Sequence, residues 1–85
     1  MTFQIIWTER AKKDLRKLES RTAERIINKT NELSASENPF LEKIKDQPYY
    51  KFRIGNYRII LERILSRRIL IVLRVGNRKN IYKKI

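Results

Sequence analysis

Apolar and polar residues alternate along residues 49–54 and again along residues 57–61, and a Gly55-Asn56 pair separates the two runs. Alternation with a period of two is typical of β-strands. A pair that contains glycine between two such runs predicts a tight β-hairpin, because glycine tolerates the positive φ that primed turns require. A two-residue loop would pair the residues across the hairpin in this way: Ile54 with Tyr57, Phe52 with Ile59, and Arg53 with Arg58.

The predicted hairpin has an apolar face and a cationic face, because side chains alternate faces along a strand. The apolar face would carry Phe52, Ile54, Tyr57, Ile59 and Leu61. The other face would carry Lys51, Arg53 and Arg58. Like charges directly opposite each other destabilise a sheet, and nothing in folding requires three cations there. The cationic face therefore indicates a site for an anion.

One strand and two helices are predicted before the hairpin. Residues 3–7 are apolar and β-branched, which predicts a strand, and Thr8 can cap the helix that follows. The apolar stripe of that helix consists of Ala11, Leu15 and Leu18. A second helix starts at Ser20 or Thr22, and its stripe consists of Ala23, Ile26, Ile27, Thr30 and Leu33. A segment rich in Ser, Asn and Pro ends it.

The other segments predict a loop and two further strands. Residues 40–48 form a connecting loop, with three apolar residues expected to anchor it: Phe40, Leu41 and Ile44. Residues 58–65 form a strand. Residues 68–75 are apolar on both faces, as in a covered central strand, and Gly76-Asn77 would break it. We expect the helices to cover Ile69, Ile71, Leu73 and Val75. The aromatic residues expected in the core are Phe3, Trp7, Tyr50 and Tyr57.

These elements predict an α+β fold with the order β-α-α-β-β-β. A helical hairpin would pack on one face of a small, mostly antiparallel, four-stranded sheet. The chain has 85 residues and shows no internal repeat or linker composition. We therefore expect residues 1–85 to form a single domain with one modest core.

Positive charge is concentrated in the second half of the chain. The whole chain has 21 basic and 9 acidic residues, a formal net charge of +12. Residues 1–42 carry 8 basic and 7 acidic residues, whereas residues 43–85 carry 13 basic and 2 acidic ones. This asymmetry indicates a polyanionic partner, and nucleic acid is the commonest one. A membrane partner fits less well, because the positive half is predicted to form strands and not a basic amphipathic helix.

The composition excludes several classes of chemistry. There is no His and no Cys, which excludes imidazole acid–base catalysis, cysteine nucleophiles and the usual zinc sites. The second half has too few carboxylates to hold a divalent metal, and no nucleotide-binding fingerprint occurs. We therefore expect neither a metal nor a cofactor. The absence of Cys and of a signal-peptide pattern also favours a cytoplasmic location.

Lysine, arginine and tyrosine side chains can still support cleavage of RNA by its own 2′-hydroxyl. Guanidinium groups match phosphate geometry and stabilise the charge of a pentavalent phosphate. Lysine can act as a base when neighbouring cations lower its pKa, and Lys51 lies beside Arg53 and Arg58. Tyrosine can orient a base by stacking.

Two segments carry a family resemblance. Residues 51–58 read Lys-Phe-Arg-Ile-Gly-Asn-Tyr-Arg, and residues 75–82 read Val-Gly-Asn-Arg-Lys-Asn-Ile-Tyr. With the opening strand, the helical hairpin and the basic tail, the chain resembles the RelE/ParE toxin superfamily. RelE toxins are ribosome-dependent mRNA endonucleases that an antitoxin keeps silent. The resemblance implies a type II toxin that cleaves mRNA without a metal and so inhibits translation.

The resemblance also implies roles for individual residues. Lys51 and Arg53 correspond to the basic pair of the family's central strand. Arg58 corresponds to the phosphate-stabilising arginine, Arg78 to the general acid, and Tyr82 to the stacking tyrosine. Four further residues are expected to bind RNA: Lys45, Arg74, Lys79 and Lys83.

The sequence leaves the base and the target open. Arg53 stands where a branch of RelE toxins has a lysine proposed as the base, and arginine stays protonated in proteins. Either Lys51 or ribosomal RNA would then supply the base. The expected partners are the ribosome, mRNA and a small acidic antitoxin similar to RelB. The alternatives are a ParE-type toxin that inhibits DNA gyrase without catalysis, and an inactive relative that binds RNA.

Overall fold

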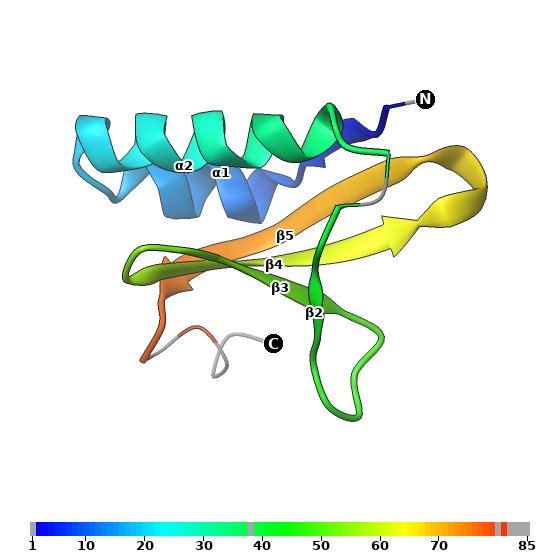
Figure 1. Ribbon diagram of the computed structural model, residues 1–85. Helices are drawn as coiled ribbons and strands as arrows, with labels where there is room; N and C mark the ends of the chain where they lie inside the picture. Colours follow the sequence, from blue (N-terminus) through cyan, green and yellow to red (C-terminus); the bar gives the residue numbers. More distant parts are fainter. Residues whose placement is uncertain (1, 38, 80, 82–85) are drawn as a thin grey trace.

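Two helices lie on one face of a five-stranded sheet, as Figure 1 shows for the computed structural model. The structure describes residues 2–37, 39–79 and 81. The elements in chain order are β1 (Gln4–Trp7), α1 (Glu9–Arg16), α2 (Ser20–Ser34), β2 (Glu42–Lys43), β3 (Tyr50–Ile54), β4 (Tyr57–Ile64), the 3-10 helix η1 (Leu65–Arg67) and β5 (Ile69–Asn77). The α+β class and the helical hairpin are confirmed.

The order of the strands across the sheet is β1-β5-β4-β3-β2. β1 pairs with β5 in parallel, and the other three pairs are antiparallel. The prediction of four strands was one strand short. β2 lies inside the segment predicted as a loop, and it extends the sheet because Glu42 pairs with Lys51 and Lys43 pairs with Tyr50.

The segment before β3 is anchored to the core by fewer residues than predicted. Leu41 packs on the core, and Ile44 is half-buried, with its backbone amide bonded to the carbonyl of Tyr49. Phe40, however, is 85% exposed, so the expectation that it anchors the loop is wrong. The short pairing of β2 with β3 fixes this segment at the sheet edge and leaves the Phe40 ring outside the core.

The hairpin of β3 and β4 has the predicted register. Ile54 pairs with Tyr57, and Arg53 pairs with Arg58. Gly55 has a φ of 58°, which explains why glycine stands at the first position of the turn. The apolar face of the hairpin joins the core cluster, to which Phe3, Ala11, Ile26, Leu33, Leu70 and Val72 also belong.

β5 faces the helices with a different set of residues from the predicted one. Leu70 and Val72 are fully buried in the core cluster, whereas Ile69, Ile71 and Leu73 are only half-buried. The register shifts by one residue between β4 and β5: Ile60 pairs with Arg74, but Leu61 pairs with Val72. The extra residue changes which face later residues occupy, and for this reason Val75 is buried as predicted.

The end of β5 also differs from the prediction. The strand does not break at Gly76-Asn77: Gly76 pairs with Arg58 and Asn77 pairs with Tyr57. The chain turns only at residues 78–79. Among the aromatic residues, Phe3 is buried, Trp7 and Tyr57 pack on the core from its margin, and Tyr50 is half-buried.

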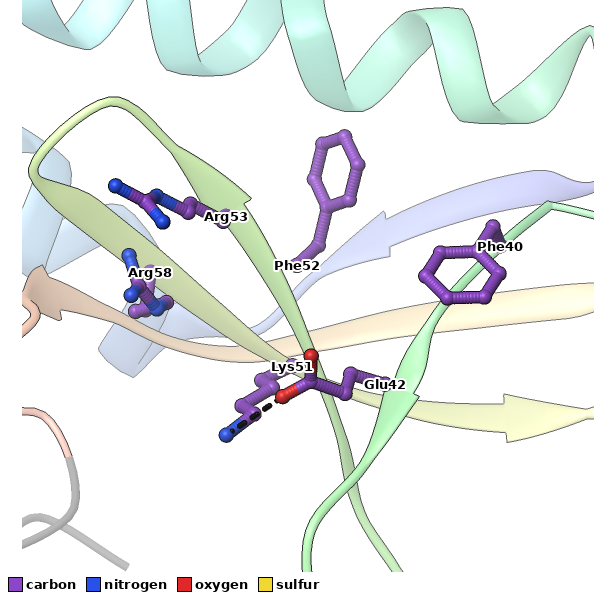
Figure 2. Close-up of a pocket in the computed structure, with 6 residues that line it drawn as sticks. All are labelled: Phe40, Glu42, Lys51, Phe52, Arg53 and Arg58. Carbon is purple, nitrogen blue, oxygen red and sulfur yellow. Dashed lines mark ion pairs between the residues drawn. The ribbon is translucent and has the colours of Figure 1, made fainter.

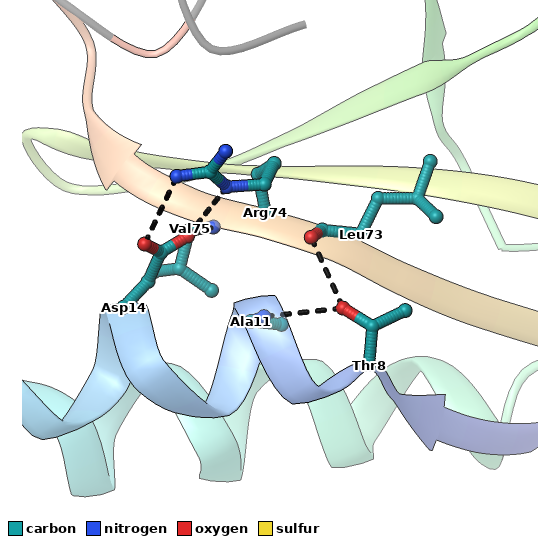
Figure 3. A network of polar contacts seen from close by, with 6 residues as sticks. All are labelled: Thr8, Ala11, Asp14, Leu73, Arg74 and Val75. Atoms are coloured by element: carbon teal, nitrogen blue, oxygen red, sulfur yellow. Dashed lines mark hydrogen bonds and ion pairs between the residues drawn. The ribbon is translucent and has the colours of Figure 1, made fainter.

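The N-terminus of α1 holds the helix against β5. The hydroxyl of Thr8 accepts a hydrogen bond from the backbone amide of Ala11 at 3.1 Å, which confirms the predicted cap. The same hydroxyl donates to the carbonyl of Leu73 at 3.1 Å (Figure 3). In α2, which begins at Ser20, Ile26, Thr30 and Leu33 are buried as predicted. Ile27 is 36% exposed, so its predicted burial is wrong.

Candidate functional site

The three cations of the hairpin line one hollow at the β3 side of the sheet (Figure 2). The hollow has a volume of about 240 Å³, and its lining residues are Phe40, Glu42, Lys51, Phe52, Arg53 and Arg58. β2 supplies Glu42, and β3 and β4 supply the cations. The sequence analysis predicted that Lys51, Arg53 and Arg58 share a face, and the structure brings them to one place.

Arg53 and Arg58 face each other directly across the hairpin. The Nε of Arg53 donates to the carbonyl of Gly55 at 3.4 Å, and Nη1 of Arg58 donates to the carbonyl of Tyr57 at 3.3 Å. Neither guanidinium forms an ion pair with a carboxylate within residues 2–37, 39–79 and 81. Two adjacent arginines of this kind concentrate positive potential where a planar anion can be bound by two forks.

Lys51 differs from the two arginines because it has a carboxylate partner. Its Nζ lies 2.8 Å from Oε2 of Glu42, and the side chains are 28% and 63% exposed, respectively. The hydrogen bond and the charge of Lys51 hold the pKa of the Glu42 carboxyl below its usual value, and Arg58 adds to the effect. In return, the carboxylate favours the protonated form of Lys51, which opposes the effect of the neighbouring cations.

Glu42 was not among the predicted site residues. It lies nine positions before Lys51, in a segment with no strand periodicity. Only the pairing of β2 with β3 places Glu42 opposite Lys51. The one signal in the sequence was its position as a lone carboxylate close to the start of the strongly basic half.

Arg25 is a further cation that the sequence analysis left out. It belongs to α2, and its guanidinium lies against the tip of the hairpin. A β-carbon on Gly55 would lie 3.2 Å from Nη1 of Arg25. Two elements therefore place cations at the tip of the hairpin: Arg25 of α2 lies against Gly55, and Arg53 of β3 is bonded to the Gly55 carbonyl.

The other predicted residues lie in several places. Arg78 is exposed, and its backbone amide donates to the carbonyl of Asn56, which puts Arg78 beside the hairpin tip. Lys79 is exposed in the same turn, and Lys45 is exposed in the loop between β2 and β3. Tyr82 and Lys83 lie outside the described residues.

Arg74 lies apart from the hollow. Its guanidinium donates to both carboxylate oxygens of Asp14 on α1, from Nε at 3.0 Å and from Nη2 at 3.2 Å (Figure 3). The side chains are 16% and 5% exposed, respectively. The predicted RNA contact of Arg74 would have to coexist with this half-buried ion pair.

Two kinds of feature are absent from the described part of the chain. Within it, no group of three or more Asp and Glu residues could hold a metal ion. None of its helices combines the length and the apolar composition needed to cross a membrane.

Comparison with protein families gives a match over nearly the whole chain. Residues 5–82 match the model described as the ParE toxin of the type II toxin–antitoxin system parDE. No curated protein sequence is detectably similar to the chain.

Solved structures with the same fold include several toxins. A mutant of the Escherichia coli toxin RelE in the free state has a TM-score of 0.78 and 29% identity, over 98% of this chain and 93% of that chain. RelE in the intact E. coli RelBE complex has a TM-score of 0.73 and 29% identity, over 91% and 96%. A chain of the Mycobacterium tuberculosis RelBE2 complex has a TM-score of 0.83 at 21% identity, over 92% and 100%, and at that identity shows the fold alone.

Proposed function

This chain belongs to the ParE toxin family of type II toxin–antitoxin systems, within the RelE/ParE superfamily, and from that premise we propose that it is a metal-independent endoribonuclease that cleaves mRNA on the ribosome. The observation that carries the proposal is the hollow in which Lys51, Arg53 and Arg58 meet. An inhibitor that acts only by binding a protein has no need of three cations gathered at one point. A phosphodiester that becomes a pentavalent dianion does need them.

The cations have distinct parts in this reaction. Arg53 and Arg58 bind the phosphate oxygens, and their forks keep the phosphorus atom in line between the attacking and the leaving oxygen. Lys51 adds a point charge to the same group. Arg78, beside the hairpin tip, gives a proton to the leaving 5′-oxygen, and Tyr82 stacks on a base of the mRNA.

The proposed partner is a small acidic antitoxin, and the proposed location is the cytoplasm, where ribosomes are. Solved relatives are complexes of a RelE toxin with RelB. A carboxylate-rich segment of the antitoxin would cover the hollow and neutralise its potential, which keeps RNA out.

The second candidate is inhibition of DNA gyrase without catalysis. What favours it is the description of the matching family model, which names ParE and not RelE. The two functions differ in their need for Arg58, because only a nuclease uses the charge of Arg58 in a transition state.

Purified protein added to mRNA-programmed ribosomes tests the proposal. We expect single cuts in the mRNA that leave a 2′,3′-cyclic phosphate upstream and a 5′-hydroxyl downstream. Arg58→Ala should lower the single-turnover rate by about 10²–10³-fold. Arg67→Ala is the matched control, because Arg67 is an exposed arginine in η1 at the opposite end of β4. If the protein instead stopped DNA supercoiling by purified gyrase and left the mRNA intact, the second candidate would be established.

A further inference from the structure

Among the described residues that line the hollow, Glu42 alone carries a carboxylate. Figure 2 shows it reaching from β2 toward β3, where a dashed line joins the Glu42 carboxylate to Nζ of Lys51. We propose that Glu42 is the general base of the cleavage reaction, and that it accepts the proton of the attacking 2′-hydroxyl. This inference rests on the proposed endoribonuclease function and adds to it a catalytic residue.

The first step of the argument is by elimination. The chain has no His and no Cys. The arginines of the hollow stay protonated at every relevant pH. Lys51 has a carboxylate 2.8 Å away, and this partner favours its ammonium form, which has no lone pair for a proton. Of the titratable groups that line the hollow within residues 2–37, 39–79 and 81, Glu42 is the one that can accept a proton at neutral pH.

The second step concerns access. Glu42 is 63% exposed although it lines the hollow, so its second oxygen can reach a bound nucleotide. Lys51 and Arg58 lower the pKa of the carboxyl, which makes Glu42 a weak base but keeps it fully in the proton-accepting form at neutral pH. Carboxylates of this kind serve as general bases when they are held within hydrogen-bond reach of the proton.

The third step is the chemistry itself. The 2′-hydroxyl gives its proton to the Glu42 carboxylate, and the 2′-oxygen forms a bond to phosphorus. The bond from phosphorus to the 5′-oxygen then breaks, and a cationic donor of the site protonates the leaving oxygen. The products are a 2′,3′-cyclic phosphate and a 5′-hydroxyl. Glu42 returns its proton to solvent, and the donor regains one, so no oxidant, reductant or metal is required.

The ion pair of Glu42 with Lys51 links removal of the proton to stabilisation of the transition state. When Glu42 takes up the proton, it loses its charge, and its attraction for Lys51 falls. The full charge of the ammonium then acts on the phosphate at the moment when negative charge develops there. An interaction that strengthens only in the transition state raises the rate without tightening ground-state binding.

The test measures single-turnover cleavage of mRNA on programmed ribosomes. We expect Glu42→Gln to lower the rate by about 10²–10⁴-fold across about pH 6 to 9. Binding of an mRNA with a 2′-deoxy nucleotide at the cut position should stay unchanged. The matched control is Asp46→Asn, which removes one negative charge from the loop that follows β2; Asp46 is not among the residues that line the hollow. Asparagine also tolerates the φ of 61° at that position.

The wild-type protein supplies a second measurement that needs no variant. With Glu42 as the base, its rate is constant across about pH 6 to 9 and falls only in acid, because the carboxylate is already deprotonated. A rate that climbs through this range would assign the base to a lysine and overturn the inference. A Glu42→Gln variant as fast as wild type, or faster, would also overturn it, because Glu42 would then only compete with the phosphate for Lys51. In both cases the cleavage by wild-type protein would leave the proposed function intact, whereas a wild-type protein without cleavage would refute that function.

Discussion

The carboxylate of Asp14 on α1 accepts a hydrogen bond from the backbone N–H of Val75 in β5, with 2.9 Å between Oδ2 and the nitrogen. β1 ends at Trp7, which pairs with Val72, so beyond that point this edge of β5 has no neighbouring strand among the described residues. A helix side chain thus satisfies a buried backbone donor of the sheet, and the same carboxylate also binds Arg74 (Figure 3). The contact joins α1 directly to β5.

Asp14→Ala should therefore cost much more stability than a surface charge change. It removes the carboxylate that binds both a buried N–H and a half-buried guanidinium, which costs about 3–5 kcal/mol by analogy with other broken buried pairs. Urea denaturation followed by circular dichroism measures the loss. Glu9→Ala is the control, because the Glu9–Lys12 pair is exposed and should contribute less than about 1 kcal/mol. Equal losses for the two variants would show that Asp14 has no special structural role.

Arg78→Ala should separate catalysis from binding. Arg78 is exposed in the turn after β5, so the variant should fold normally. We expect the cleavage rate to fall by about 10²–10³-fold, because the transition state loses the cationic donor to its leaving 5′-oxygen. Ribosome binding should change little, since many Lys and Arg residues share the phosphate contacts. Arg78→Lys should rescue the rate in part, and Arg67→Ala provides the charge-matched control. A wild-type rate in Arg78→Ala would contradict the proposed role.

Gly55→Ala should destabilise the hairpin for two separable reasons. A residue with a β-carbon is strained by about 1–2 kcal/mol at the φ of Gly55, and the new methyl group also meets Arg25. Arg25→Ala in the Gly55→Ala background should restore the steric part and leave the backbone part. A double-mutant cycle of unfolding free energies gives the coupling. Zero coupling would mean that Arg25 moves aside at no cost.

Co-expression with the adjacent open reading frame should yield a complex with a small acidic protein. The attraction arises from the strongly basic half of the toxin, so the complex should form more slowly as salt is added. A pull-down through a tag on the toxin identifies the partner. Recovery of the toxin alone, together with normal growth of the expressing cells, would argue against an antitoxin-controlled toxin.

Features that depend on short-range sequence could be predicted. Gly55-Asn56 fixed the hairpin register because two residues decide the geometry of the turn. Thr8 was recognised as a cap because the hydroxyl acts on the next helical turn. β2 could not be predicted, since a two-residue strand has no periodicity, and the position of Glu42 in the hollow depends on it.

Other features depend on distant parts of the chain. The faces of β5 were assigned by simple alternation, but one extra residue in its pairing with β4 changes the phase near Leu73. Asp14 was not predicted to be buried, because charged residues are normally exposed. Its burial follows from the missing neighbour of β5, which no local pattern reveals.

The place of β5 in the sheet also affects how the protein is made. β1 and α1 are synthesised first, yet both pack on β5, which is translated only after the hairpin of β3 and β4. At about 5–20 residues per second, these N-terminal elements wait several seconds for their partner. A nascent chain therefore carries the cations of the hairpin before it has the strand that holds them in place. The toxin fold is completed only after β5 has been translated, and an antitoxin already present in the cell has that interval in which to meet it.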